Sequence, residues 1–450
     1  MKGKLIVVLV LLCAHLGITG GILTNTNQSA QFIRTLSRNA ATDIDAVYYN
    51  PAGTSALSEG LHIALYNQTI FQEKTVNNSY PLLAQNEFVG KVNVPFFPNL
   101  YAIYKMDDLA VSFGFGPNAG GGSAEYSTGL PSFEMNIANL PPMISAMGIP
   151  TSGYKADLNF NGSSVYYGVQ GNVAYEVNEM ISVAVGARFI YAVNTYEGAI
   201  SNIQINPMNP GFGMNGTYMS AVQFFQALSA VNPAAGAYVP LVSDASVDVK
   251  QTGSGITPII GVNVKPMENL NIGVKYEMVT TLELTNETTE DATGTFPDGA
   301  IFRNDIPAIL GLGAEYAFVP QFRGAFSFTY YFDKNADWEG REEFVDSNFF
   351  EAALGLEYDL TETIGLSAGV LHSETGVTEL YQTDISHSLT SNTVGFGLRY
   401  GLSPALDFDL GGLYTFYGEG EKNYSSNNIP IIETYNRSNF AIALGLGYHF

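Results

Sequence analysis

The sequence is short of positive charge and of cysteine, and each shortage excludes a class of protein. It holds 19 Lys and Arg against 42 Asp and Glu, which gives a formal net charge of -23. Binding to nucleic acid needs basic patches that contact phosphates, so we expect no nucleic-acid partner. The one cysteine, Cys13, lies in the N-terminal segment. We therefore expect no disulfide and no cysteine-ligated metal in the remainder of the chain. As a separate expectation, the sequence calls for no cofactor and no other metal.

The chain also lacks long hydrophobic runs and carries few charges of either sign. Charged residues make up 14% of it, whereas soluble domains average about 25%. We interpret this as a surface that does not face water everywhere. After the N-terminal segment, no apolar run reaches the roughly 18 residues that a membrane-spanning helix needs. Helical membrane spans are therefore excluded.

The first 20 residues have the layout of a secretory signal peptide. Lys2 and Lys4 precede the apolar stretch LIVVLVLLCAHL, and small residues follow between 17 and 21. This stretch is too short to span a bilayer comfortably. We therefore expect residues 1–20 to be removed on export. A lipid anchor on Cys13 is the alternative, but Leu12 is bulky where a small residue is expected.

Glycine, tyrosine and phenylalanine are abundant, with 47, 27 and 28 residues. In the last segment of the chain, large apolar side chains occupy every second position from Phe440 to Phe450, and small residues stand between them. The same period of two recurs in residues 183–189, 270–276, 310–316, 326–332 and 394–400. A period of two is typical of β-strands, so the sequence predicts an all-β protein.

The charges of these segments fall in the small-residue register, at Glu176, Arg188, Lys275, Glu277, Glu315, Arg323, Glu357, Arg399, Asp407 and Asp409. A soluble sandwich also alternates apolar and polar residues. It would rarely combine a strand face made only of large apolar and aromatic residues with so few charges elsewhere. Arg or Lys facing lipid costs about 2 to 4 kcal/mol near the bilayer midplane, which explains both features. The pattern therefore predicts a transmembrane antiparallel β-barrel.

Short and long connections alternate along the chain, as they do in outer-membrane barrels. Short turns fall in residues 105–108, 177–179, 266–269, 319–320, 359–362 and 401–404; long connections fall near 75–90, 118–155, 199–246, 285–302, 335–346, 375–388 and 419–437. This alternation predicts about 14 strands in residues 60–450, with the longest outer loops at 118–155 and 199–246. Residues 21–59 are too polar for a strand pair. Because a barrel of this size needs water or a plug in its lumen, we predict that they form an N-terminal plug.

The plug segment ends in Tyr49-Asn50-Pro51-Ala52-Gly53, the second strand contains PNLYAIYK (98–105), and the third begins LAVSFGFGPNAGGG (109–122). With these segments the chain resembles the FadL/TodX family of outer-membrane transporters for long-chain fatty acids and aromatic hydrocarbons, over nearly its whole mature length. The resemblance implies a lumenal hatch formed by residues 21–59, ligand capture in an apolar groove between two long outer loops, and sideways release at an inward kink of the third strand. Asn50, Pro51, Ala52 and Gly53 would hold the end of the hatch against the wall; a plain turn into the first strand is the alternative.

Two features of the sequence fit this mechanism. Gly114, Gly116 and Pro117 weaken the third strand, since interior glycine often marks a bend and proline cannot donate to the ladder; small inward-facing residues are the alternative for the two glycines. The longest loops are apolar, and we predict that their side chains line the groove: Phe133, Ile137, Leu140, Met143, Ile144, Met147, Met219, Val222, Phe225 and Leu228. Such residues suit varied apolar ligands. Alternatively, the two loops pack on each other and close the mouth.

A carboxylate ligand would need a cation inside the barrel, and Arg188, Lys275 and Arg323 are candidates. Each of these cations has acidic neighbours in the same inward-facing register, such as Glu277 and Glu315. A structural network of ion pairs is therefore an equal alternative. The family's head-group residues cannot be carried over, because the inner strands have no motif to align.

The sequence does not favour an enzyme. Gly365 to Gly369 matches G-x-S-x-G but lies within an alternating strand, and Gly211 to Gly216 matches G-x-G-x-x-G but lies in a loop without a βαβ unit. The five histidines show no metal-ligand spacing. His372 or His387 beside the serines at 386 and 388 is the only arrangement that suggests a hydrolase, and these residues fall in a predicted outer loop.

The sequence therefore predicts a monomeric, passive transporter in the outer membrane of a Gram-negative-type bacterium. Its partners would be hydrophobic small molecules or fatty acids and the lipid of the outer membrane. A general diffusion porin with an open polar lumen is one alternative. A structural or adhesion barrel, whose apolar loops contact a partner, is the other. The sequence leaves open which hydrophobic ligand is carried.

Overall fold

The computed structural model describes residues 22–426 and 428–450 of the chain. The predicted signal peptide lies outside the described residues. Within those two stretches, no helix has the length and apolar character needed to cross a bilayer.

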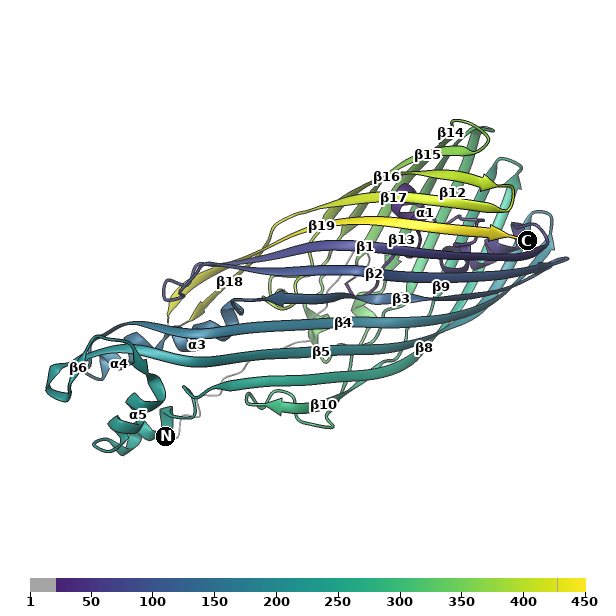
Figure 1. The fold of residues 1–450 in the computed structure, drawn as a ribbon. Coiled ribbons are helices and arrows are strands. Elements are labelled where there is room, and N and C mark those ends of the chain that lie inside the picture. Colours follow the sequence, from purple (N-terminus) through teal and green to yellow (C-terminus); the bar gives the residue numbers. More distant parts are fainter. Residues whose placement is uncertain (1–21, 427) are drawn as a thin grey trace.

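Fourteen strands of the described chain form one closed antiparallel ring (Figure 1). In ring order they are β1 (Gly60–Asn78), β2 (Glu87–Met106), β3 (Leu109–Tyr126), β4 (Thr151–Asn178), β5 (Ile181–Asn209), β8 (Ala245–Met267), β9 (Leu270–Glu277), β12 (Ile309–Val319), β13 (Phe322–Tyr331), β14 (Phe350–Asp359), β15 (Ile364–Glu374), β16 (Ser391–Ser403), β17 (Leu406–Tyr417) and β19 (Ile429–His449). β19 pairs with β1 and closes the ring. The predicted barrel of about 14 strands is confirmed.

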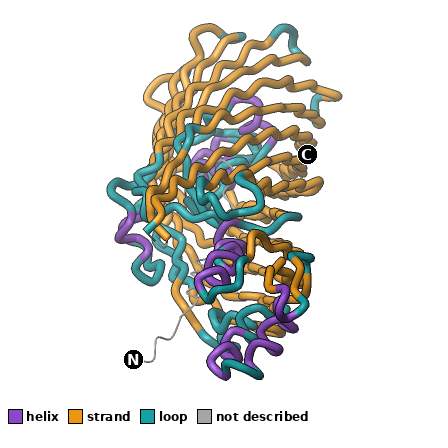
Figure 2. Tube along the Cα trace, turned by 90° about the vertical axis from the view of Figure 1, so that its left-hand side faces the viewer, coloured by secondary structure: helices purple, strands orange, loops and turns teal. Residues whose placement is uncertain are grey.

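The two ends of the ring differ. Short hairpins and the C-terminus lie at one end, which we call the inner end; at the other, outer end the strands continue into β6 (Met214–Asn215), β7 (Met219–Ser220), β10 (Glu283–Asp291), β11 (Ile301–Arg303) and β18 (Gly420–Ser426). The outer end also carries the helices α3 (Pro131–Ala138), α4 (Leu140–Ala146), α5 (Ala221–Ser229), η2 (Pro210–Phe212), η3 (Pro233–Tyr238), η4 (Asp333–Asn335) and η5 (Arg341–Phe344). Figure 2 shows several of them gathered at this end of the molecule.

The two longest connections are shorter than the sequence pattern predicted. β4 and β5 contain 28 and 29 residues, far more than the roughly 10 that cross a membrane. The outer ends of β3, β4, β5 and β8 extend into the predicted loops 118–155 and 199–246 and leave connections of residues 127–150 and 210–244. An antiparallel ladder does not need lipid to form, and polar partners such as Asn161 and Glu197 continue it into water.

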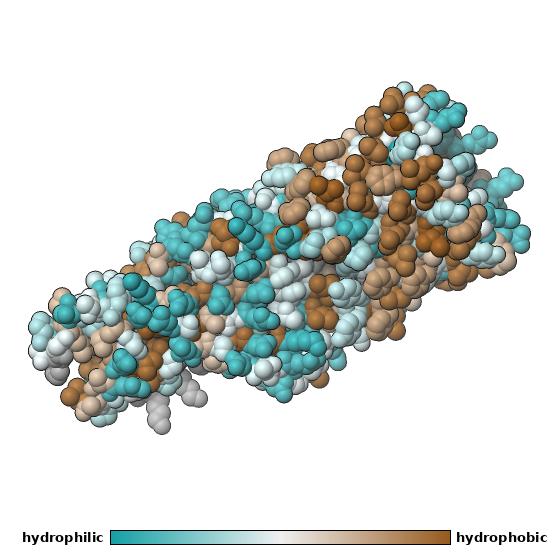
Figure 3. All heavy atoms as spheres, viewed as in Figure 1, coloured by the Kyte–Doolittle hydropathy of each residue, from teal (hydrophilic) through white to brown (hydrophobic). Residues whose placement is uncertain are grey.

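The outer wall near the inner end is apolar. Leu65, Phe71, Phe440 and Leu444 are exposed on β1 and β19, and Figure 3 shows hydrophobic residues gathered over this half of the molecule. Near the short hairpins, four tyrosines are exposed: Tyr104, Tyr316, Tyr358 and Tyr400. Such a band with an aromatic rim is what lipid requires of a barrel. The fold is therefore a transmembrane β-barrel.

Residues 22–59 lie inside the ring, towards its inner end. They form α1 (Ala30–Thr35), α2 (Ala46–Tyr49) and η1 (Pro51–Ala56). α1 contacts β1, β14 to β17 and β19, whereas α2 and η1 contact β2 to β5, β8 and β9 on the opposite wall. The glycines of the inward register make room for this segment, because a Cβ on Gly395 would approach the Ile33 carbonyl to 2.5 Å. We keep the name hatch for residues 22–59.

Candidate functional site

The ring is hydrogen-bonded all round except between β2 and β3. These strands pair at Lys91 and Val92 and then not again until Leu100, which pairs with Phe115. Residues 93–99 of β2 and 116–123 of β3 therefore face each other without a ladder. At about 3.3 Å per residue, this interruption is roughly 20 Å long.

Prolines and two left-handed glycines produce the interruption. Pro95 and Pro98 remove two amide donors from β2, and Pro117 removes one from β3. Gly120 and Gly122 have φ of 82° and 80°, which L side chains rarely adopt. The β3–β4 register shifts around the same residues, between 117 and 119 and between 120 and 122. β3 thus bends away from β2 while it stays attached to β4.

Of the kink residues predicted from the sequence, Gly116 and Pro117 lie at the start of the unpaired stretch and Gly114 lies just before it. Pro117 lies at the first register shift, but Gly114 pairs regularly with Tyr101. A Cβ on Gly114 would lie 3.1 Å from the Tyr101 ring, and one on Gly116 would collide with the Asn99 amide. Both glycines are small inward-facing residues that leave room inside the barrel. The missed residues, Pro95 and Pro98, carried a signal in the sequence, because proline is rare within a central strand.

The interruption lies within the lipid-facing band. Phe96 is 77% exposed, and Phe71 on β1 and Phe115 on β3 are also exposed on the outer surface. The pairing of Phe71 with Asn93 sets this part of β2 at the height of the Phe71–Phe440 stack. The unpaired segments therefore face the membrane interior, not the water on either side.

The start of the hatch covers the interruption from inside. Thr24 forms an antiparallel bridge with Ala119, the Asn25 amide donates to the Asn118 carbonyl at 2.8 Å, and the Gly120 amide donates to the Leu23 carbonyl at 3.2 Å. The backbone groups that β3 would otherwise leave unpaired in the bilayer are thereby satisfied.

Gln28 links this part of the hatch to both strands. Its Nε2 donates to the Pro117 carbonyl at 2.9 Å, and its Oε1 accepts from Asn99 Nδ2 at 2.7 Å. One buried side chain thus bridges β2 and β3 across the interruption. A movement of residues 24–28 would break these bonds and expose the edge of β3.

The Asn-Pro-Ala-Gly signature joins the other end of the hatch to the wall. Asn50 Nδ2 donates to the Ala41 carbonyl at 3.0 Å and to Asn263 Oδ1 on β8 at 2.7 Å. Pro51 begins η1, where its missing N–H has no cost, and the Ala52 carbonyl accepts from Ser182 on β5 at 3.1 Å. At Gly53 a Cβ would lie 2.5 Å from the Asn50 amide. Each residue of the signature therefore has a structural role at this junction between the hatch and the wall.

The predicted head-group cations are engaged in ion pairs. Arg188 and Lys275 each lie 2.6 Å from a carboxylate oxygen of Glu277. Both also lie over the Tyr48 ring, at 4.8 and 4.5 Å from its centroid, and Lys275 Nζ donates to the Tyr48 carbonyl at 2.7 Å. These two residues therefore hold α2 of the hatch.

The third candidate, Arg323, lies near the short hairpins and pairs with Glu357 and with Asp359, the latter at 3.4 Å. Glu357 also pairs with Arg34 of α1, whose Nε lies 2.9 Å from Asp409 Oδ1 on β17. The network of ion pairs that the sequence left as an alternative is what the geometry shows at all three positions.

The predicted groove residues are packed against one another. Eight of the ten belong to a single cluster between α4, α5 and the outer ends of β4 and β5: Ile137, Leu140, Met143, Ile144, Met219, Val222, Phe225 and Leu228. Phe133 belongs to a neighbouring cluster with Phe160 and Phe296, and Met147 is exposed. The two loops thus form one apolar module at the outer end of the barrel.

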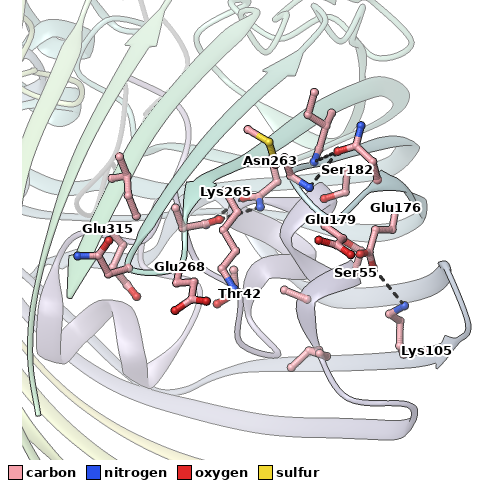
Figure 4. Close-up of a pocket in the computed structure, with 18 of the residues that line it drawn as sticks. Thr42, Ser55, Lys105, Glu176, Glu179, Ser182, Asn263, Lys265, Glu268 and Glu315 are labelled. Atoms are coloured by element: carbon pink, nitrogen blue, oxygen red, sulfur yellow. Dashed lines mark hydrogen bonds and ion pairs between the residues drawn. The ribbon is translucent and has the colours of Figure 1, made fainter. Parts of the chain in front are cut away.

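The inner end of the lumen is polar. A cavity of about 560 Å³ lies between η1 and the hairpins (Figure 4). Its lining is rich in carboxylates, with Glu59, Asp107, Glu176, Glu179, Glu268 and Glu315, against Lys105 and Lys265. Burial of a hydrophobic compound among these charges would be unfavourable. This cavity is therefore unsuited to a hydrophobic ligand.

The comparisons with known proteins agree with this architecture. No protein-family model matches the chain, and no curated protein matches it in sequence. Among solved structures, a FadL homologue of Pseudomonas aeruginosa superposes with a TM-score of 0.66 at 13% identity, covering 95% of this chain and 99% of that one.

Two transporters of aromatic compounds are also similar to the chain. The toluene transporter TodX of P. putida has a TM-score of 0.57 at 14% identity, over 91% of this chain and 95% of that one. The toluene transporter TbuX of Ralstonia pickettii has 0.54 at 12%, over 90% and 94%. The chain therefore has the fold of the FadL/TodX outer-membrane transporters.

Proposed function

We propose that the protein is a passive transporter that brings hydrophobic compounds across the outer membrane and releases them sideways into the bilayer. The observation that carries the proposal is the interrupted β2–β3 ladder, which faces lipid and is covered from inside by the start of the hatch. In this mechanism the apolar outer module captures the ligand. The ligand then enters the lumen, residues 24–28 move off β3, and the ligand leaves through the interruption.

The direction of release follows from the two possible exits. The inner cavity is lined by carboxylates, whereas the interruption opens between Phe96 and Phe115 on a lipid-facing surface. An apolar molecule gains about 25 cal/mol for each Å² that it moves from water into an apolar environment. Lateral release therefore needs no energy source, no nucleotide and no catalytic chemistry, and we propose that the protein acts as a monomer and not as an enzyme.

The proposal is tested by ligand content and uptake. Organic extracts of the detergent-purified protein, analysed by mass spectrometry, should contain apolar or amphiphilic small molecules. Cells that lack other hydrophobic-compound transporters should take up a radiolabelled long-chain fatty acid or toluene when they express the chain. A barrel with empty extracts and no uptake would refute the proposal.

A general diffusion porin is the second candidate, and the hatch argues against it. Residues 22–59 are nearly all buried inside the ring and bonded to opposite walls. A porin should conduct ions to the same extent with or without that segment. We expect instead that deletion of residues 22–59 converts a nearly silent protein into an open channel in planar bilayers.

A further inference from the structure

Two positive side chains lie face to face at the outer edge of the membrane band. Lys74 on β1 and Arg437 on β19 are direct cross-strand partners, three residues beyond the stacked pair Phe71 and Phe440. Phe71 and Phe440 point outward, so Lys74 and Arg437 fall in the inward register. The pair therefore lies inside the barrel wall, about 10 Å further out than the phenylalanines.

Lys74 is fully buried and has no partner. Its exposed fraction is 0%, and its Nζ donates to no acceptor. Its cross-strand neighbour Arg437 has the same sign. Among the described residues, no carboxylate accepts a hydrogen bond from Lys74 Nζ, although the chain contains 42 Asp and Glu. Like charges on facing residues destabilise a sheet, and a buried charge without a partner is costly.

Further unsatisfied donors surround this pair. The His387 ring stacks on Tyr435 at 5.0 Å, with both nitrogens unpartnered, and its carbonyl accepts from Arg437 Nη2 at 2.9 Å. Asn439, two residues from Arg437 on the same face of β19, has an unpartnered amide. Burial, with Arg437 and Lys74 nearby, holds the pKa of His387 well below its usual range, so the ring is a neutral donor. Buried donors without partners are uncommon in proteins and mark places where an acceptor binds.

Apolar side chains adjoin the same place. Val76, Leu389 and Tyr435 form a buried cluster with Ala138 of α3, next to the apolar outer module. Val76 follows Lys74 on the same face of β1. A molecule with one anionic end and a long apolar body would place its charge beside Lys74 and its body along this cluster.

We propose that Lys74, Arg437, His387 and Asn439 form an anion site at the outer mouth of the lumen, which receives the carboxylate of a long-chain amphiphile. The inference rests on the proposed transport function and names the class of ligand that the chain prefers. The site is separate from Arg188 and Lys275, which are paired with Glu277 and hold the hatch. A bound anion favours the protonated form of Lys74, so Lys74 supplies the positive charge in the complex, and the His387 ring and the Asn439 amide supply N–H donors.

The test compares a long-chain fatty acid with its methyl ester, which has the same apolar body and no charge. Binding of each is measured by titration on the full mature chain in neutral detergent. Lys74→Met removes the charge, and Lys74→Arg keeps it. Lys91→Met is the matched control, because Lys91 lies at a similar height but is exposed on the outer face of β2.

We expect wild type, Lys74→Arg and Lys91→Met to bind the acid at least about tenfold more tightly than the ester, a difference of about 1.4 kcal/mol. Lys74→Met should bind both alike. Because this variant loses a buried charge, it should fold at least as well as wild type, which heat-modifiable gel migration will check.

Three results would overturn the inference. Equal binding of acid and ester by wild type would refute the anion site and leave the transport function standing. Displacement of the acid by lipopolysaccharide, in wild type but not in Lys74→Met, would assign the site to a phosphate of membrane lipid. Binding of neither compound would refute the site and the proposed function together.

Discussion

Loss of Arg34 should loosen the hatch, and its cost can be estimated from the buried ion pairs. Arg34 Nε lies 2.9 Å from Asp409 Oδ1, and its Nη1 contacts Glu357 and lies 3.2 Å from Ser367 Oγ. In Arg34→Met, Asp409 keeps only Gln31, whose Nε2 lies 2.8 Å from its carboxylate. Removal of one partner of a buried pair costs about 3 to 5 kcal/mol. A loss of this size shifts the equilibrium between the docked and the undocked hatch towards the undocked state by roughly a hundredfold to a few thousandfold.

Single-channel recording in planar bilayers measures this shift as the fraction of time in a conducting state. Arg34→Met should open far more often than wild type. Arg34→Met/Asp409→Leu is the matched control, because an apolar pair in place of a buried ion pair is often neutral; Glu357 keeps Arg323 in both variants. A silent Arg34→Met, or a double variant that conducts as much as the single one, would refute the reasoning.

Three other predictions concern the interruption, the outer module and the outer loop of residues 375–390. Pro95→Val/Pro98→Val restores two amide donors to β2, so the ladder should lengthen and uptake of a labelled fatty acid should fall, while the amount of folded barrel is unchanged. Phe225→Ala leaves a cavity at a fully buried position of the outer module. The free energy of unfolding of the module should fall by about 3 to 5 kcal/mol. The module should then become sensitive to protease and capture ligand more weakly, while the barrel still folds. Burial raises the pKa of Asp384 in the outer loop at 375–390. The folded loop therefore holds a proton on Asp384 more tightly than the unfolded loop does. The stability of the folded loop should fall as the pH rises through the raised pKa. The loop should resist protease better at pH 5 than at pH 8, and Asp384→Asn should remove most of the difference.

The sequence was most informative where the membrane restricts the choice of residue. Phe440 and Leu444 had to face lipid, and Arg188 and Asp409 had to face inward, so the period of two predicted the strands, their faces and the ring. Outside the bilayer this restriction ends, which is why the sequence pattern predicts loops at the outer ends of β3, β4, β5 and β8, over residues 118–126, 151–155, 199–209 and 245–246.

The candidate site was harder to predict, because its contacts join residues that are distant in sequence. Asp409 was recognised as an inward charge, but its partner Arg34 lies 375 residues away. Likewise, the pairing of Arg188 and Lys275 with one carboxylate depends on the order of β5, β8 and β9 around the ring. The sequence analysis places the break at Gly114, Gly116 and Pro117 of β3. Pro95 and Pro98 of β2 lie opposite, and they also matter because proline removes the amide that a ladder needs.

The central claim is that ligand leaves sideways once the start of the hatch moves off β3, and a reversible cross-link tests it most directly. Thr24 and Ala119 form an antiparallel bridge, and facing residues of such a pair have Cα atoms about 4.5 to 5.5 Å apart, within the range of a disulfide. The control is Thr393→Cys/Thr415→Cys, a facing pair on β16 and β17 that lies away from the interruption.

The measurement is uptake of a labelled long-chain fatty acid by cells that express Thr24→Cys/Ala119→Cys, before and after reduction, with the cross-link verified by mass spectrometry. We predict little uptake while the disulfide is closed, recovery to the wild-type rate after reduction, and no change in the control pair. Equal uptake in the cross-linked and reduced states would contradict lateral release beneath the hatch.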